Sequence, residues 1–238
     1  GYTGFVGSNI CKNFNFQYKF NSKNIGTLCY NNYDLLVSSG IRAEKFLANK
    51  YPQEDMKAID FFMEKIKSVK TKKIIVISTI DVYEKTVDID ERYVIQKENL
   101  QPYGLNRKIF EEFIMEYFSN YLIVRLPALY GTGLKKNFIY DLINKVPSVI
   151  LKGKYNELYN LANDEEKKIL SNNYFKDKNG DYEYLNRLNN KKLLIKFLEK
   201  NKYTSLIFTD SRSKFQFYNL DYLWKDINIA LNNNIDIL

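Results

Sequence analysis

The sequence opens on a glycine-spaced segment, Gly1-Tyr2-Thr3-Gly4-Phe5-Val6-Gly7, which runs directly into a predicted helix over residues 8–14. Gly1 permits a tight turn, Gly4 lets backbone N–H groups approach an anion, and Gly7 lets the helix pack closely on a sheet. The helix N-terminus offers its partial positive charge to that anion. We therefore predict a phosphate-binding loop formed by Gly1, Gly4, Phe5, Val6 and Gly7, with an ordinary glycine-rich turn as the alternative. A strand is expected to precede such a loop.

Short apolar runs and helical patterns alternate along the following part of the chain. In one helix, apolar residues recur at helical spacing from Met56 to Ile66, and Glu54 and Asp55 suit its start because carboxylates favour a helix N-terminus. Strands that alternate with helices predict a parallel sheet covered on both faces, the Rossmann-type doubly wound α/β fold. We expect strands at 16–20, 33–37, 73–77 and 121–126, and helices at 8–14, 56–66, 109–117 and 137–144.

The character of the chain changes after residue 147, and residues 155–190 are polar and rich in Asn, Lys and Tyr. Beyond them we expect a helix at 193–198, a strand at 205–209 and a final helix at 221–231 that carries Trp224. These patterns predict a Rossmann domain over residues 1–147. They also predict a small C-terminal α+β appendage over residues 148–238, which would bind substrate.

The composition excludes several classes of chemistry. The 238 residues include no histidine and two cysteines, Cys11 and Cys29. Catalysis by a histidine base and a zinc site of the usual kind are therefore excluded, so we expect no metal and assign acid–base chemistry to Tyr, Lys, Asp or Glu. The two cysteines and the lack of a long apolar run favour a protein of the reducing cytoplasm with no membrane partner. The net charge of +8 comes from scattered lysines, which indicates no nucleic-acid partner but suits a phosphate-bearing ligand.

A group of polar side chains is predicted at the carboxyl edge of the sheet. Ser78 and Thr79 follow the strand at 73–77, and ligands of open α/β sheets bind at that edge. Tyr103 begins a helix and Arg107 follows four residues later, so both lie on one helix face. A neighbouring cation favours the phenolate, so we expect Arg107 to lower the pKa of Tyr103. Thr79 would hydrogen-bond a substrate oxygen while Tyr103 transfers its proton. The alternative is that Tyr103 only packs between helix and sheet.

These motifs together resemble the extended short-chain dehydrogenase/reductase family, particularly its nucleotide-sugar epimerases and dehydratases. The opening loop is similar to the family's GxxGxxG loop, and the resemblance covers most of residues 1–147 and then a weaker tail. Further segments that resemble family motifs, in the same order, are Ser78-Thr-Ile-Asp-Val-Tyr83, Tyr103-Gly-Leu-Asn-Arg107, Arg125-Leu-Pro-Ala-Leu-Tyr-Gly131 and Phe215-Gln-Phe-Tyr-Asn-Leu-Asp221.

The resemblance implies an NAD(P)-dependent enzyme, an epimerase, dehydratase or oxidoreductase that moves a hydride to and from a bound nicotinamide. It implies that Tyr103 is the acid/base, that Thr79 orients the reacting oxygen and that Arg107 positions the nicotinamide ribose. Ser78 and Pro127 would join the loop in binding the cofactor. The implied partners are a small-molecule substrate, a nucleotide-sugar, and a second copy of the chain in a homodimer.

Several positions leave alternatives open. No acidic residue follows segment 16–20 to hold an adenosine ribose; Ser22 and Lys23 occur there, which suits the 2′-phosphate of NADP. NADP is therefore a hypothesis beside NAD, and a plain surface turn is the alternative reading of these two residues. Arg107 occupies the position of the family's lysine, and Ala128 that of its asparagine. These departures leave a second function open, a non-catalytic NAD(P)-binding sensor or interaction protein of the same fold.

Overall fold

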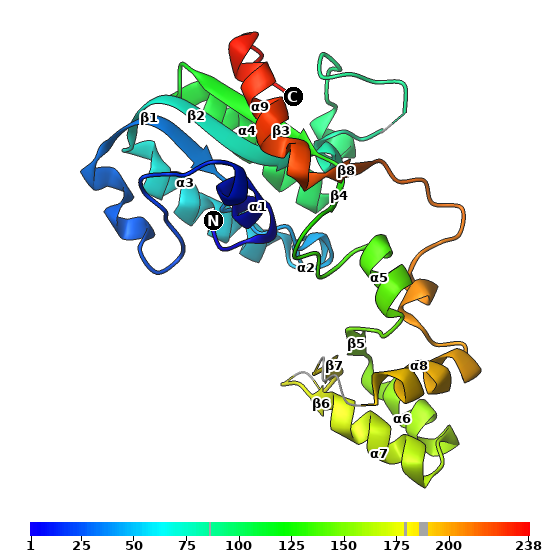
Figure 1. Cartoon of the computed structure of the whole chain (residues 1–238). Coiled ribbons are helices and arrows are strands. Elements are labelled where there is room, and N and C mark those ends of the chain that lie inside the picture. Colours follow the sequence, from blue (N-terminus) through cyan, green and yellow to red (C-terminus); the bar gives the residue numbers. More distant parts are fainter. Residues whose placement is uncertain (86, 179, 186–189) are drawn as a thin grey trace. The chain divides into compact units, whose positions relative to one another are not determined.

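The chain forms two compact units (Figure 1). The computed structural model describes residues 1–85, 87–178, 180–185 and 190–238. The first unit joins Gly1–Gly133 to Phe215–Leu238, and the second spans Leu134–Lys214. This division differs from the boundary expected at residue 147, because the end of the chain returns to the first unit instead of completing the second.

A parallel sheet forms the centre of the first unit. Within the described residues it has three strands in the order β1-β2-β3, namely β1 (Asn32–Ser38), β2 (Lys70–Thr79) and β3 (Tyr121–Leu126). The strands expected at 33–37, 73–77 and 121–126 are thereby confirmed. Ile74 and Ile75 are completely buried, as expected for a strand covered on both faces. The register sets Thr79 opposite Leu126, so the carboxyl ends of neighbouring strands meet at one edge.

Helices cover both faces of this sheet (Figure 1). The helices of the first unit are α1 (Phe5–Asn13), α2 (Lys45–Lys50), α3 (Pro52–Lys67), α4 (Pro102–Tyr117) and α9 (Leu223–Asn232), with 3-10 turns η1 (Ile25–Tyr30), η2 (Ile80–Val82), η3 (Lys97–Asn99) and η5 (Leu220–Tyr222). Helices α3 and α4 pack on Ile74 and Val76, whereas α1 and α9 pack on Ile75. Because alternate side chains of β2 enter two separate cores, the Rossmann-type doubly wound fold is confirmed.

Backbone pairing ties the returning segment to the first unit. Strand β4 (Ala128–Tyr130) pairs in parallel with β8 (Phe217–Asn219). Along β3, the N–H group of Ile123 donates to the carbonyl of Asp236 at 2.8 Å, and that of Arg125 donates to Leu238 at 2.7 Å. These contacts, together with the packing of α9, place residues 215–238 with the sheet.

Residues 16–20 form no strand, contrary to the expectation from their alternating pattern. A strand exists through backbone hydrogen bonds to a neighbouring strand. In the part of the chain that the structure describes, no strand pairs with this segment. The segment and β1 instead line a cavity of about 350 Å³. The apolar side chains still find partners: the ring centroids of Phe16 and Trp224 are 5.6 Å apart, and Phe20 packs against the core under α3. The alternation therefore reflects packing and not pairing.

The second unit has its own apolar core and a small antiparallel sheet in the order β5-β7-β6. Its elements are α5 (Phe138–Asn144), β5 (Val149–Ile150), α6 (Lys152–Leu161), α7 (Asp164–Asn173), β6 (Tyr174–Lys176), β7 (Tyr182–Tyr184), α8 (Lys191–Lys200) and the 3-10 turn η4 (Ser205–Phe208). The small α+β part is confirmed, but the strand expected at 205–209 is wrong. Its residues turn because the N–H and Oγ of Ser205 donate to the carbonyls of Lys145 and Asp141.

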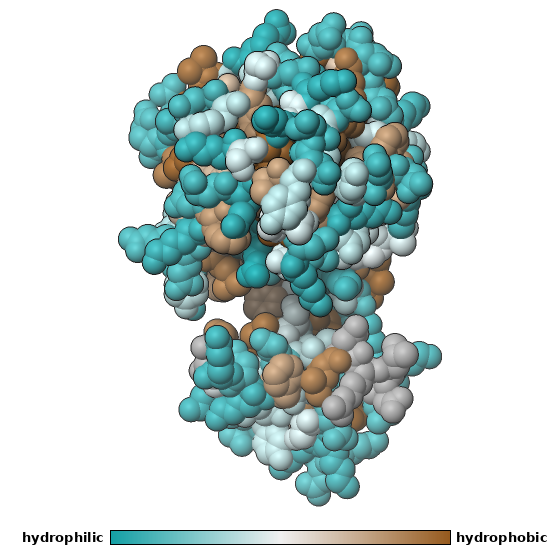
Figure 2. All heavy atoms as spheres, turned by 90° about the vertical axis from the view of Figure 1, so that its left-hand side faces the viewer, coloured by the Kyte–Doolittle hydropathy of each residue, from teal (hydrophilic) through white to brown (hydrophobic). Residues whose placement is uncertain are grey.

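The surface carries mainly hydrophilic residues on the face that Figure 2 shows, and the hydrophobic ones lie in separate groups. Large apolar side chains that remain exposed include Phe46 and Phe61, at 75% and 60% of their full exposure. In the part of the chain that the structure describes, no helix combines the length and the apolar character that a membrane crossing needs.

Candidate functional site

The glycine loop packs directly on the carboxyl end of β1. A Cβ atom on Gly1 would lie 2.2 Å from the carbonyl oxygen of Ser39, and one on Gly7 would lie 2.3 Å from the carbonyl oxygen of Gly1. Such distances are too short for a carbon atom against backbone, so both positions require glycine. A Cβ atom on Gly4 would meet the oxygen of Gly1 at 3.3 Å, a less severe contact.

The first turn of α1 has N–H groups that an anion could accept hydrogen bonds from. The helix begins at Phe5 with Gly4 as its N-cap, and no side chain caps it. The first N–H groups of a helix, here those of Phe5, Val6 and Gly7, have no partner within the helix. Together with the helix dipole they attract negative charge, so the sequence-predicted loop has the donor set that a phosphate needs.

Thr79 and Tyr103 are brought together by the packing of α4 on the end of β2. A Cβ atom on Gly104 would lie 1.9 Å from the carbonyl oxygen of Asp81, so glycine allows the start of α4 to lie directly on the η2 turn. The N–H group of Tyr103 donates to Asn49 Oδ1 at 2.9 Å, which also fixes the helix start. A hollow of about 70 Å³ results, lined by Val6, Ser39, Ile41, Arg42, Ala43, Ile77, Ser78, Thr79, Tyr103 and Arg107.

The Arg107 guanidinium is held by protein partners. It donates to both carboxylate oxygens of Asp55, at 2.6 and 3.0 Å, and to the carbonyl oxygen of Arg42 at 2.5 Å. Its central carbon lies 4.4 Å from the centroid of the Tyr103 ring. The side chain is 4% exposed. Arg107 therefore lies on the predicted face beside Tyr103, with its charge balanced by Asp55.

Burial raises the pKa of Tyr103 above its ordinary value, although Arg107 acts in the opposite direction. Arg107 thus acts on this pKa in the expected direction, but the net effect is a raised pKa. The phenol is 6% exposed, so the loss of hydration of a phenolate outweighs the effect of the cation. The carboxylate of Asp81 also raises the pKa, and a hydrogen bond with Thr79 lowers it. Tyr103 is thus a protonated phenol at neutral pH.

A buried ionic network, which the sequence analysis missed, lies beneath this hollow. Arg125 of β3 donates from Nε and Nη2 to Glu111 of α4, at 3.1 and 2.6 Å, and Glu111 is completely buried. Ser78 Oγ donates to Glu111 at 2.5 Å, and Arg125 Nη1 donates to the Tyr83 hydroxyl at 2.6 Å. The Ser78 hydroxyl, predicted to bind cofactor, is therefore engaged in positioning the end of β2. The sequence feature that could have indicated this network is the charged residue Arg125 within the apolar run at 121–126.

Other predicted cofactor residues lie away from the hollow. Ser22 and Lys23 are exposed in a turn in which the Lys23 N–H donates to Asn21 Oδ1 at 2.9 Å. Pro127 is half-buried between β3 and β4. None of the three lines the hollow at Tyr103.

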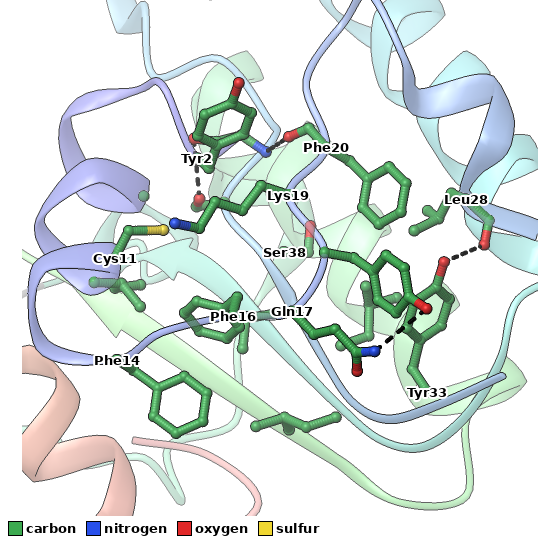
Figure 3. Close-up of a pocket in the computed structure, with 18 of the residues that line it drawn as sticks. Tyr2, Cys11, Phe14, Phe16, Gln17, Lys19, Phe20, Leu28, Tyr33 and Ser38 are labelled. Atoms are coloured by element: carbon green, nitrogen blue, oxygen red, sulfur yellow. Dashed lines mark hydrogen bonds between the residues drawn. The ribbon is translucent and has the colours of Figure 1, made fainter. Parts of the chain in front are cut away.

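The larger cavity, of about 350 Å³, lies beside β1 (Figure 3). Phe14, Phe16 and Phe20 contribute aromatic walls, and Gly1 and Gly7 lie in its lining as well. Ser38 Oγ is buried in this lining without a hydrogen-bond partner among the described residues. The glycine loop therefore borders this cavity, while Val6 borders the hollow at Tyr103.

Comparison with known proteins supports the fold. No protein-family model and no curated protein matches the sequence. Two solved structures, dTDP-4-dehydrorhamnose reductase from Yersinia enterocolitica and RMD from Pseudomonas aeruginosa complexed with NADPH, are each similar at 16% identity and a TM-score of 0.50. Each match covers 61% of this chain and 57% of the solved chain. A UDP-glucuronic acid 4-epimerase from Bacillus cereus is 22% identical with a TM-score of 0.45, over 61% of this chain and 60% of that one.

The chain thus spans less than two thirds of the length of the solved chains that it matches. At these identities the likeness shows the fold. That fold is the Rossmann-type doubly wound α/β fold that the order of the elements predicted.

Proposed function

We propose that this protein is an NAD(P)-dependent nucleotide-sugar epimerase, dehydratase or reductase that uses Tyr103 for acid–base chemistry. The observation that carries the proposal is the hollow at the carboxyl edge of the sheet, which Val6 of α1, Thr79 of β2 and Tyr103 of α4 line together. The hollow thereby brings together a helix start that suits a phosphate and a phenol–hydroxyl pair that suits proton transfer. The reductase and the RMD–NADPH complex have this fold, which supports the same class of enzyme.

The loop residues Gly1, Gly4, Phe5, Val6 and Gly7 would hold the diphosphate of NAD or NADP. They fit this group because the first turn of α1 has no side-chain cap and the glycines place no side chain in front of its N–H groups. Ser78 and Pro127 would border the nicotinamide end, and Ser22 and Lys23 would meet the 2′-phosphate of NADP. The chemistry that a nicotinamide supplies when bound is hydride exchange with a substrate carbon.

Tyr103 would move the proton. As a protonated phenol it donates to a substrate carbonyl oxygen while that carbonyl becomes a hydroxyl, and it takes the proton back in the reverse direction. The Thr79 hydroxyl would hydrogen-bond the same oxygen and orient it. Burial raises the pKa of Tyr103, so the phenol holds the proton that the reductive direction would consume.

The second unit would select the substrate. The sequence predicted this role for residues 148–238; because the second unit spans Leu134–Lys214, we propose the role for those residues. The homodimer and the cytoplasmic location stay predictions from the sequence.

A non-catalytic NAD(P)-binding protein of the same fold is the second candidate. It is favoured by the partners of Arg107, because Asp55 and the Arg42 carbonyl bind the guanidinium that a ribose would otherwise meet. Such a protein would bind the cofactor and turn nothing over.

One experiment separates the two candidates. The protein is incubated with NAD⁺ or NADP⁺ and a set of UDP- and dTDP-sugars, and with NADH or NADPH and the corresponding keto-sugars, and nicotinamide absorbance and sugar products are followed. We expect turnover that falls by roughly 10²–10⁴-fold in Tyr103→Phe. Tyr117→Phe, on the exposed end of the same helix, is the matched control and should keep full activity. Cofactor binding without turnover would select the second candidate, and full activity in Tyr103→Phe would contradict the role of Tyr103.

A further inference from the structure

Asp55 lies in the first turn of α3, and its carboxylate binds two residues of α4 that follow Tyr103 in the chain. Its carboxylate receives two hydrogen bonds from Arg107 and a third from Asn106 Nδ2, at 2.9 Å. Asn106 also donates to the carbonyl of Pro52 at 3.0 Å. Hydrogen bonds therefore hold the start of α3 against α4, about one turn beyond Tyr103. The side chains of Arg107 and Asp55 are 4% and 13% exposed.

Stability alone is a weak reason for such a pair. The cost of removing two charges from water can equal or exceed their attraction, and apolar side chains of similar size often serve as well. What the ion pair adds is geometry and charge balance: the guanidinium is held 4.4 Å from the centroid of the Tyr103 ring, and the pair as a whole carries no net charge.

We propose that Asp55 is a positioning residue of this site, whose carboxylate fixes the Arg107 guanidinium over the Tyr103 ring and offsets part of its charge next to the reacting phenol. The proposal rests on the function proposed above, because it concerns the group that would transfer the proton. Its consequence is that Arg107 lowers the pKa of Tyr103 less than an unpaired cation would, so that burial prevails and Tyr103 remains a proton donor. Without the carboxylate, the bare cation would favour the phenolate.

Other charged groups around Tyr103 do not replace Asp55. Those near the phenol are Arg107 of α4, Asp81 of η2, Lys45 of α2, which is paired with Asp81 at 2.6 Å, and Arg42 in the lining of the hollow. Asp81 already shares its charge with Lys45 and is partly exposed. Asp55 is therefore the group whose charge balances Arg107.

The test is a titration of Tyr103 in the protein without cofactor or substrate. Tyrosine is labelled with ¹³C at Cζ, and the Tyr103 signal is assigned from its loss in Tyr103→Phe. In Asp55→Asn, which keeps the shape and one acceptor oxygen, we expect Tyr103 to titrate at lower pH than in the wild type. Asp60→Asn, exposed on the same helix, is the matched control and should leave the titration unchanged. A folded Asp55→Asn protein with the wild-type titration would overturn the proposal.

A second variant covers the case in which the single change unfolds the protein. Asp55→Asn combined with Arg107→Gln removes both charges, so no uncompensated cation stays buried. We expect Tyr103 to titrate in this variant at the wild-type pH or above it, because the cation that lowers its pKa has been removed together with the carboxylate that balances it. A titration displaced to clearly lower pH would show that the charge of Arg107 does not act on Tyr103, and would refute the proposal.

Activity gives a separate readout. If the wild type reduces a nucleotide-sugar, activity in Asp55→Asn should be lost at lower pH as the phenol ionises earlier, while the KM for the sugar stays the same. If the wild type turns over no substrate, the proposed function fails, and the titration of Tyr103 still decides the role of Asp55.

Discussion

At the scale of single residues, two buried carboxylates hold the groups around the hollow. Asp55 binds Arg107 beside Tyr103, and Glu111 binds Ser78 and Arg125 beneath the end of β2. The sequence predicted the glycines, Thr79 and Tyr103, because those residues occur in short spacings that carry their own chemistry. It gave no sign of the Asp55 pair, whose partners are 52 residues apart in the chain. It also did not indicate the net rise of the Tyr103 pKa, since burial depends on the packed structure.

The loop offers a prediction at this scale. Gly7→Ala should destabilise the protein by about 1–3 kcal/mol, because its Cβ would lie 2.3 Å from the Gly1 oxygen and 2.7 Å from Ser39 Oγ. The matched control is Gly26→Ala, since a Cβ there meets nothing within 4 Å, and its effect should stay within about 0.5 kcal/mol. Urea unfolding of both variants checks this. Equal losses of unfolding free energy would show that the loop does not pack on β1 as described.

At the scale of elements, the sequence predicted the described strands of the parallel sheet, β1, β2 and β3, but it also predicted strands at 16–20 and 205–209 that do not form. The runs at 73–77 and 121–126 are apolar because both faces of β2 and β3 are covered, so burial alone reveals them. The pattern at 16–20 alternates in the same way as a strand, but pairing depends on what lies alongside. Segment 205–209 likewise turns because its backbone is bound within the second unit.

Helix α9 gives a prediction at this scale. Ile227 is completely buried against the sheet, and Ile229, two residues later, is 49% exposed. Ile227→Ala should cost about 2–5 kcal/mol and Ile229→Ala less than about 1 kcal/mol. The single tryptophan of the chain, Trp224, lies in the same helix and in the core of the first unit, so its fluorescence reports this unfolding. Similar losses in both variants would mean that α9 does not pack on the sheet through this face.

At the scale of the whole molecule, one chain forms a sheet-based unit, leaves it to build a second core, and returns. The loop, Thr79, Tyr103 and the Asp55–Arg107 pair all belong to the first unit, which joins Gly1–Gly133 to Phe215–Leu238. The division of the chain differs from the boundary expected at residue 147, because local patterns reveal helices and strands but not the pairing of β4 with β8. The order of the elements was enough to predict the fold class. It did not indicate that the last helix, α9, belongs to the first unit.

The central claim is that Tyr103 and a nicotinamide act on one substrate at this edge of the sheet. The most direct test incubates the full chain with nicotinamide cofactor deuterated at C4 and with UDP- or dTDP-linked keto-sugars, and analyses the sugar by mass spectrometry. The account predicts deuterium on the sugar carbon that becomes a hydroxyl carbon, and its absence in Tyr103→Phe. A product formed without deuterium, or equal labelling by Tyr103→Phe, would contradict it.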